Sequence, residues 1–468
     1  MASTLHTLQE SSQAVASADH GVPVDYVSFD GGVRISTARL QPDRYRTLES
    51  SQRGPAPVIS RGAGLSYAAA SFSSSAITIE HPHFNRLLDF DAATQTIEVE
   101  AGTPLGKLYE FLTPRGFFVS VQPGHPKISV GGCIASDVHG KNQYRDGTFS
   151  SLVVSLKLLH PSYGTLELSQ ENEPELLALT CGGYGLTGSI VSARLKVTPI
   201  ESASVQLRVT NVDSIYHLPD ALREAASRSD LVYSWHQFTS LRGKNFGRGS
   251  IIEGSFAPPA ASSAPQKGQS LASTKSSLDS ATRGRRLPGF FNSLTTAPFN
   301  RLYAGMSQLG GKEKIIPLYD FLFPVHDKEL YFHLFGKGGF HEYQIIIPFS
   351  RYQEFMSMLQ QRLETHPFPI TLASGKLFQG EQKLLRFTGE GICFSFNFPR
   401  SSSSLQFAEF LDKLAVQCAA QPNLIKDSRL PAAVVSATYP EYERFRKLLR
   451  AFDPNRSFRS ELSDRLQL

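Results

Sequence analysis

The chain has 468 residues, of which 41% are hydrophobic and 19% charged, enough for two globular domains with sizeable cores. Its formal net charge of +5, from 47 basic and 42 acidic residues, is too balanced to indicate nucleic-acid binding, although it suits an anionic ligand or a membrane surface. The four cysteines form no CxxC pair, so we expect reduced thiols and neither a zinc or other metal site nor a disulfide framework.

Residues 1–21 lack the basic start and apolar core of a secretory signal, and we interpret them as a mobile tail. No run of about 20 apolar residues occurs, so no membrane-spanning helix is predicted. Together with the reduced thiols, these features predict a cytoplasmic protein, and peripheral contact with a membrane stays open.

The first 200 residues mix strand-like and helix-like patterns. Strands are predicted at 24–40, 56–59, 76–80, 96–101, 152–159, 165–168 and 189–198. Helices are predicted at 42–50, 103–115 and 173–179. The helix at 103–115 is expected to have Thr103 as its cap and Pro104 in its first turn, and to end at Gly116.

Two glycine-rich loops stand out in this part of the chain. Residues 58–67 read VISRGAGLSY, and residues 119–142 read VSVQPGHPKISVGGCIASDVHGKN. Glycine lets the backbone approach a flat or phosphorylated group, because no Cβ intervenes. Backbone N–H groups of a Gly-x-Gly turn can hold phosphate oxygens, and Arg61 can add a positive charge. His139 adds a titratable imidazole beside an acid and an amine.

A third set of glycines, Gly183, Gly185 and Gly188, satisfies the GxGxxG pattern of Rossmann domains. That motif needs a strand before it and a helix after it. Here a predicted helix precedes the glycines and a predicted strand follows them. We therefore interpret them as a turn and not as a Rossmann dinucleotide site.

From about residue 204 the pattern becomes that of an antiparallel sheet covered by helices. Strands are predicted at 205–209, 231–237, 250–256, 321–325, 342–348, 370–377 and 391–399, and helices at 215–227, 350–364, 407–417 and 440–452. Residues 258–288 are rich in Ser, Ala, Pro and Gly and cannot bury enough apolar surface to fold alone. They are either a mobile surface loop or a lid whose arginines meet an anionic, lipid-linked substrate at a membrane.

The segments RGAGLSY, PGHPKISVGGCIASDVHGKN and GGYGLTG together resemble the PCMH-type FAD-binding domain of the vanillyl-alcohol-oxidase superfamily. Within it they are most similar to the decaprenylphosphoryl-β-D-ribose 2′-oxidase family. The resemblance runs from about residue 33 to 468, with a gap in the middle. It implies an α+β fold with a FAD-binding domain at 22–203 and 421–468, and a substrate domain at 204–420.

The resemblance also implies an activity. Enzymes of this family oxidise a ribose hydroxyl to a 2′-ketone, which a reductase partner returns as the arabinose epimer. We therefore expect an FAD-dependent oxidoreductase that acts on a secondary CH–OH group of a sugar, a pentose linked to polyprenyl phosphate. The alternatives are an aldonolactone or sugar-alcohol oxidase of the same superfamily, and a flavin-binding subunit without catalysis.

In this family one glycine loop holds the pyrophosphate of FAD and the other lines its isoalloxazine, and the turn at Gly185 closes over the flavin. Leu65 stands where covalently flavinylated sugar-lactone oxidases carry a histidine, so the resemblance implies non-covalent FAD. The cofactor-binding residues that it implies are Arg61, Gly62, Ala63, Gly64, Leu65, Ser66, Tyr67, Gly124, Ser129, Val130, Gly131, Gly132, Ser136, Asp137, Val138, His139, Gly185, Ile190 and Asn423.

Three catalytic residues follow from the resemblance. Lys426, in the segment IKDSR, matches the family's essential lysine, and His139 and Tyr67 match residues beside the flavin and the substrate. Alcohol oxidation needs a group that accepts the hydroxyl proton or stabilises the alkoxide. The alternative for Lys426 is a surface lysine paired with Asp427, and the alternative for His139 is a core histidine satisfied by backbone.

Four further residues match the family's substrate pocket: Gln344, Lys376, Phe378 and Cys393. Cys393 lies in the alternating run GICFSFNF, where a simple buried thiol is the alternative.

Three positions depart from the family pattern. Asn423 replaces a tyrosine that contacts the flavin, Glu342 aligns near the first pocket glutamine, and Gly391 replaces a pocket asparagine. The last two departures affect sugar and polyprenyl specificity.

Overall fold

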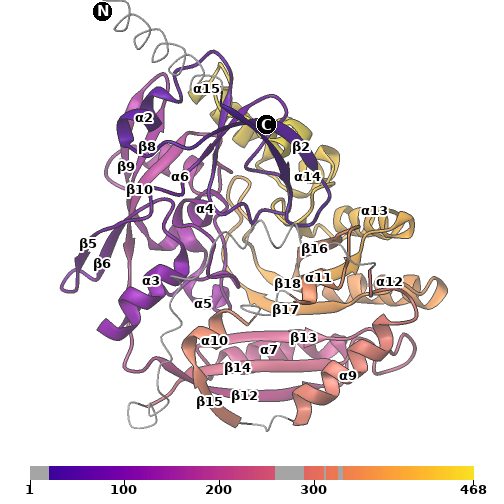
Figure 1. Ribbon diagram of the computed structural model, residues 1–468. Helices are drawn as coiled ribbons and strands as arrows, with labels where there is room; N and C mark the ends of the chain where they lie inside the picture. The colour runs from indigo at the N-terminus through magenta and orange to yellow at the C-terminus, as the bar shows by residue number, and fades with distance from the viewer. Residues whose placement is uncertain (1–20, 259–288, 310–312, 325–329) are drawn as a thin grey trace, which may run out of the picture.

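The computed structural model describes residues 21–258, 289–309, 313–324 and 330–468 (Figure 1). Its fold is α+β, as predicted, and the strands of these residues form four sheets. Among the described helices, none has the length and apolar character needed to cross a bilayer. The predicted tail and nearly all of the loop at 258–288 lie outside the described residues.

The N-terminal part contains the three smaller sheets. One is four-stranded, in the order β1 (Val22–Val27), β2 (Arg34–Leu40), β4 (Ile77–Glu80) and β3 (Val58–Arg61). The next is five-stranded, in the order β5 (Leu87–Asp91), β6 (Thr96–Glu100), β10 (Ser189–Lys196), β8 (Val153–His160) and β9 (Gly164–Ser169). Two short strands, β7 (Phe117–Phe118) and β11 (Thr198–Pro199), pair separately.

Short helices connect these strands: α2 (Tyr45–Ser50), α3 (Leu105–Leu112), α4 (Val130–Ala135), α5 (Gln143–Asp146) and α6 (Pro174–Thr180). The predicted order around the GxGxxG pattern is confirmed, because α6 precedes Gly183 and β10 follows Gly188. The predicted cap of α3 is wrong. Pro104 is its N-cap, and Thr103 is fully buried with its hydroxyl donating to a backbone carbonyl.

The second part is built on an eight-stranded antiparallel sheet, the lower sheet of Figure 1. Its strand order is β15 (Glu313–Pro317), β12 (Ser204–Val212), β14 (Gly249–Phe256), β13 (Leu231–His236), β17 (Leu372–Phe378), β18 (Gly391–Pro399), β16 (Phe340–Ile347) and β19 (Gln421–Pro422).

One face of this sheet is covered by helices. Side chains of α7 (Leu218–Ala226), α12 (Tyr352–Thr365) and α13 (Ser402–Gln417) share a buried core with alternate residues of the strands, such as Tyr343 and Phe396. Because successive side chains of a strand point to opposite faces, Glu342, Gln344 and Asn397 are directed to the other face. That face is turned towards the N-terminal part of the chain.

The strand predicted at 321–325 is wrong. Residues Leu318–Leu322 form helix α10, because Leu318, Phe321 and Leu322 recur at helical spacing and are all buried. Two helices were not predicted in this region, α9 (Thr296–Leu309) and α11 (Leu330–His333).

The C-terminal segment returns to the N-terminal part, and Figure 1 shows its yellow helices beside the indigo strands. Helices α14 (Ala432–Thr438), α15 (Tyr442–Phe452) and α16 (Glu461–Arg465) contribute side chains to the core of that part. Val58 of β3 exchanges backbone hydrogen bonds with Ser457 and Arg459, of 2.8 and 3.1 Å. The domain boundary at residue 421 stays a prediction.

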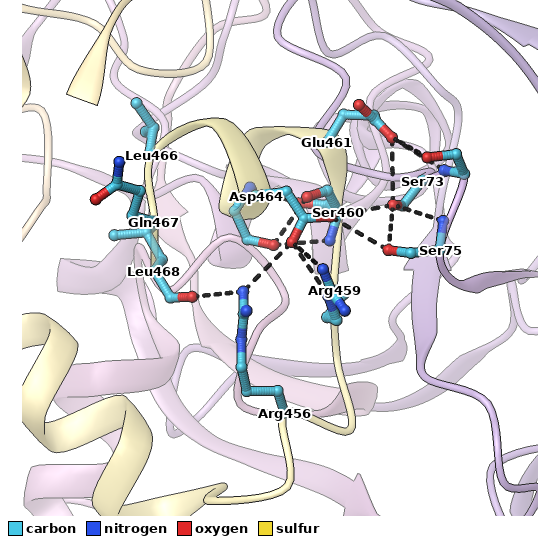
Figure 2. Close-up of polar contacts among 12 residues, drawn as sticks. Ser73, Ser75, Arg456, Arg459, Ser460, Glu461, Asp464, Leu466, Gln467 and Leu468 are labelled. Carbon is cyan, nitrogen blue, oxygen red and sulfur yellow. Dashed lines mark hydrogen bonds and ion pairs between the residues drawn. The ribbon is translucent and has the colours of Figure 1, made fainter.

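A polar network fixes this return (Figure 2). Asp464 accepts hydrogen bonds from Arg459 at 2.8 and 3.1 Å, from Arg456 at 3.3 Å and from the hydroxyl of Ser75 at 3.2 Å. Glu461 accepts from the backbone N–H of Ser74 at 2.9 Å. The acids of α16 thus tie the end of the chain to residues 73–75, which follow the first glycine loop.

Replacing Asp464 by Asn should lower the free energy of unfolding by about 1–2 kcal/mol, because two arginines and a serine lose a charged acceptor. Urea denaturation measures the change. The control is Asp220→Asn, because Asp220 pairs with Arg223 at 3.2 Å but has 89% of its side chain exposed. That change should stay within about 0.5 kcal/mol, and equal losses in both variants would contradict the network's role.

Candidate active site

A cavity of about 820 Å³ lies between the uncovered face of the eight-stranded sheet and the loops of the N-terminal part. This volume is large for a small-molecule site. The two glycine-rich loops and the turn at Gly185 line one side of the cavity, and β12 to β18 line the other. The cavity therefore brings together segments that are far apart in the sequence.

Glycines keep the loop side of the cavity open. A Cβ at Gly62 would collide with the hydroxyl of Ser129, and Gly64 has the positive φ of +67° that suits glycine. In the part of the chain that the structure describes, the backbone N–H groups of residues 62–66 donate to no other residue. Free N–H groups on a glycine turn are the pattern that binds phosphate oxygens.

Most predicted cofactor residues line the cavity: Gly62, Ala63, Gly64, Leu65, Ser66, Tyr67, Gly124, Ser129, Gly131, Gly132, Ser136, Asp137, Val138, His139, Gly185, Ile190 and Asn423. Val130 does not, since it is fully buried in the core behind the loop.

Arg61 is also absent from the lining, contrary to its predicted phosphate contact. Its guanidinium lies 4.6 Å from the ring centre of Tyr26, donates to Ser71 at 2.8 Å and approaches Glu80 at 3.8 Å. Arg61 therefore braces the base of the first glycine loop and does not reach into the cavity.

Lys426 lies in the cavity wall beside Glu342 and Tyr67. Its Nζ is 3.2 Å from Oε1 of Glu342 and 4.0 Å from the ring centre of Tyr67. The alternative of a surface lysine paired with Asp427 is wrong, because Lys426 pairs with Glu342 and Asp427 pairs with Arg429 at 2.9 Å. Burial, then the charge of Glu342 and a hydrogen bond to it, raise the pKa of Tyr67 well above its ordinary value.

His139 lies against the ring of Phe378, with 4.8 Å between ring centres. Its Nδ1 is 3.5 Å from Nζ of Lys376 and 3.3 Å from the carbonyl oxygen of Gly140, and its Nε2 is 3.4 Å from Oε1 of Gln344. Burial, and then the positive charge of Lys376, lower the pKa of His139 well below its ordinary value. The imidazole is therefore neutral at physiological pH.

Gln344 is held in a defined orientation. Its Oε1 accepts from Nδ2 of Asn423 at 2.6 Å, and its Nε2 donates to Ser395 at 2.8 Å. The backbone N–H of Asn423 also donates to the carbonyl of Gln344 at 2.7 Å. Asn423 thus fixes the side chain of Gln344, which faces His139.

The structure divides the four predicted pocket residues into two pairs. Gln344 and Lys376 line the cavity, whereas Phe378 and Cys393 are buried beside it, on the same face of the sheet, in a small core with Ile346. Burial raises the pKa of Cys393 to about 12, so the thiol stays protonated. For Cys393 the geometry matches the alternative of a buried thiol.

Several cavity residues were not predicted as site residues. On the sheet they form two halves that follow the strand order. The half on β12, β13 and β14 is apolar and aromatic, with Leu207, Val209, Tyr233, Trp235 and Ile252. The half on β16, β17 and β18 is mainly polar, with Glu342, Ser374, Ser395 and Asn397 beside the predicted Gln344 and Lys376, and it includes one apolar residue, Leu372. Strand alternation indicates which residues share a face, but not that this face borders a cavity.

Comparison with known proteins decides the family. Residues 46–168 match the family model described as an FAD binding domain. The decaprenylphosphoryl-beta-D-ribose oxidase of Mycolicibacterium smegmatis is 30% identical over 435 residues, which cover 90% of this chain and 91% of that protein. The chain belongs to the PCMH-type FAD-binding oxidoreductases.

Two further relatives cover different shares of the chain. A Streptomyces coelicolor protein described only as uncharacterized, in the mprA 5′ region, is 29% identical over 78% of this chain and its own full length. The D-arabinono-1,4-lactone oxidase of Candida glabrata is 26% identical, over 30% of this chain and 27% of that protein.

The residues present fit FAD. The free N–H groups at 62–66 suit its pyrophosphate, and the open space at Gly124 suits a group that approaches the backbone closely. A Cβ at Gly131 would lie 3.0 Å from that of Ala101, while one at Gly124 would meet nothing within 4 Å and would project into free space.

Replacing Gly62 by Ala should weaken FAD binding at least tenfold, because the new methyl group displaces Ser129 and narrows the cradle. Flavin content after purification and fluorescence titration of the apoprotein measure the loss. Gly54→Ala is the matched control, since a Cβ there meets nothing within 4 Å. Full flavin occupancy and unchanged affinity in Gly62→Ala would show that this loop does not hold the cofactor.

Proposed function

We propose that this protein oxidises a secondary hydroxyl of a sugar carried on a polyprenyl phosphate, a pentose, to the ketone, with non-covalent FAD as the oxidant. The observation that carries the proposal is the division of the sheet face into an apolar and a polar half within one cavity. A ligand that fills both halves has a polar head and a long apolar part. A free sugar would leave the half formed by β12 to β14 without a partner.

The polar half is suited to a sugar. Gln344, Ser374, Ser395 and Asn397 offer amide and hydroxyl groups that can pair with several hydroxyls at once. The side-chain oxygen Oδ1 of Asn397 is buried and has no hydrogen-bond partner among the described residues.

A flavin held by the two glycine loops would supply the two-electron oxidation. The protein's own residues hold the alcohol and the charges around it. Lys426 provides a fixed positive charge, and His139, neutral and held against Phe378, shapes the wall beside Gln344. Tyr67 keeps its phenol proton, because its pKa is raised well above the ordinary value.

The proposal includes two kinds of partner. A ketone formed on a sugar can be returned as the epimer by a separate reductase, which would complete an epimerisation. A polyprenyl substrate resides in a membrane, and large apolar side chains are exposed beside the aromatic wall of the cavity. Leu294 is 82% exposed, Leu302 is 65% exposed and Phe290 is 42% exposed, and Phe299 of the same segment lines the cavity.

The second candidate is a lactone or sugar-alcohol oxidase, which the similarity to D-arabinono-1,4-lactone oxidase favours. That similarity covers about a third of the chain, whereas the ribose oxidase similarity covers nine tenths of it. A small lactone bound to the polar half would also leave the apolar half of the cavity unfilled.

Anaerobic mixing with a panel of alcohols tests the function. A polyprenyl-phosphoryl ribose should bleach the flavin of the purified protein faster than free ribose or an aldonolactone at equal concentration. Faster bleaching by the lactone would favour the second candidate. An unbleached flavin with every compound would indicate a flavin-binding protein without this catalysis.

The FAD should be released by acid, since Leu65 offers no nucleophilic atom for a covalent bond at a position that lines the cavity. Precipitation with trichloroacetic acid should leave the yellow colour in the supernatant. Leu65→Ala serves as the control for the assay's washing steps. Colour retained in the pellet after repeated washing would contradict the prediction.

A further inference from the structure

We propose that Glu342 is the base that accepts the proton of the substrate hydroxyl, while Lys426 remains a positive charge. This inference rests on the proposed function and names a residue for one of its steps. Glu342 lies on β16, lines the cavity and is only 9% exposed. Its carboxylate is therefore held in the wall of the cavity, largely shielded from bulk water.

The position of Glu342 places a carboxylate at the centre of the polar cluster. One oxygen lies 3.2 Å from Nζ of Lys426, and this Nζ is also 4.0 Å from the ring centre of Tyr67. Among the described residues, the titratable groups whose charges interact with Glu342 include Tyr67, Lys376 and Cys393, and Lys426 is paired with it. Among them Glu342 is the carboxylate, and an ionised carboxylate has lone pairs to accept a proton.

The neighbouring groups are poorly suited to this step. Lys426 pairs with Glu342 as an ammonium group, and an ammonium has no lone pair with which to accept a proton. Tyr67 holds its own proton, and His139 binds a proton weakly, because its pKa is well below the ordinary value. Lys376 is the competing base, since burial lowers its pKa. The experiment therefore includes it.

The step balances in protons and electrons. The substrate O–H bond breaks, its proton goes to Glu342, and its electron pair forms the second bond of the ketone carbonyl. The C–H bond breaks with both its electrons as a hydride, which goes to the bound flavin. Protonation of Glu342 removes the counter-charge of Lys426, so the Glu342 and Lys426 pair gains one positive charge as negative charge arrives with the hydride.

Stopped-flow flavin reduction by the polyprenyl-phosphoryl ribose tests the inference in the FAD-loaded protein. Glu342→Gln keeps the size and a hydrogen-bonding oxygen beside Lys426 but removes the basicity. Reduction should slow about 10²- to 10⁴-fold. Because a carboxylate must be ionised to act as a base, the wild-type rate should fall at acid pH, and this acid limb should be absent from Glu342→Gln.

Two readouts separate proton transfer from structure. Flavin content and reduction by dithionite should match the wild type in Glu342→Gln. In Glu342→Ala, added formate should restore the rate at least tenfold, because a small carboxylate can occupy the vacated space. Lys426→Met should also slow reduction yet retain the acid limb.

Glu167→Gln is the matched control, since Glu167 faces Lys157 at 3.6 Å across β8 and β9 with 72% of its side chain exposed. It should reduce at the wild-type rate. Reduction of Glu342→Gln within threefold of wild type would overturn the inference, as would an acid limb lost in Lys376→Met and kept in Glu342→Gln. If Glu342→Gln does not fold, the formate response of Glu342→Ala decides. A wild-type flavin that no alcohol bleaches would overturn the proposed function itself.

Discussion

The site depends on one short segment that is hydrogen-bonded on both sides. After β19, Asn423 bonds through its backbone and side chain to Gln344 of the large sheet, and the carbonyl of Ile425 accepts from the N–H of Tyr67 at the end of the first glycine loop. Lys426 follows directly. Its ammonium is therefore placed between the sheet and the loop by backbone geometry, which limits the entropy lost when it acts on a ligand.

A second connection fixes the opposite side of the cavity. The loop between β17 and β18 inserts Leu385 into the core of the N-terminal part, and Tyr184 donates to its carbonyl at 2.6 Å. Arg386 follows, donates to Cys181 at 2.9 Å and lies 3.8 Å from Asp137. Burial raises the pKa of Asp137, and Arg386 opposes that shift. On each side of the cavity, one segment of the chain thus bonds to both the large sheet and the N-terminal part: residues 423–426 on one side and residues 385–386 on the other.

Local pattern predicted much of the fold but not which surfaces meet. The alternation in β16 and β18 identified strands, and the glycine spacing with its helix-then-strand order excluded a Rossmann site. The start of the strand predicted at 321–325 falls in helix α10, because a short apolar run suits a strand as well as a helix. Arg61 and Cys393 were placed at the site by resemblance, yet the guanidinium of Arg61 lies over the ring of Tyr26 and Cys393 is packed in a buried core beside the cavity. Such directions depend on tertiary packing, which a sequence pattern does not contain.

The pairing of Glu342 with Lys426 is better explained by chemistry than by stability. Their side chains are 11% and 27% exposed, so both lose hydration when the protein folds. An ion pair in such a place often contributes less to stability than apolar side chains of the same size would. The aromatic half of the sheet face and the cluster around Tyr67 exclude water from one side, which strengthens every charge interaction that remains. A change of one proton within the pair therefore alters the local potential strongly, and this is the property that an oxidation of an alcohol can use.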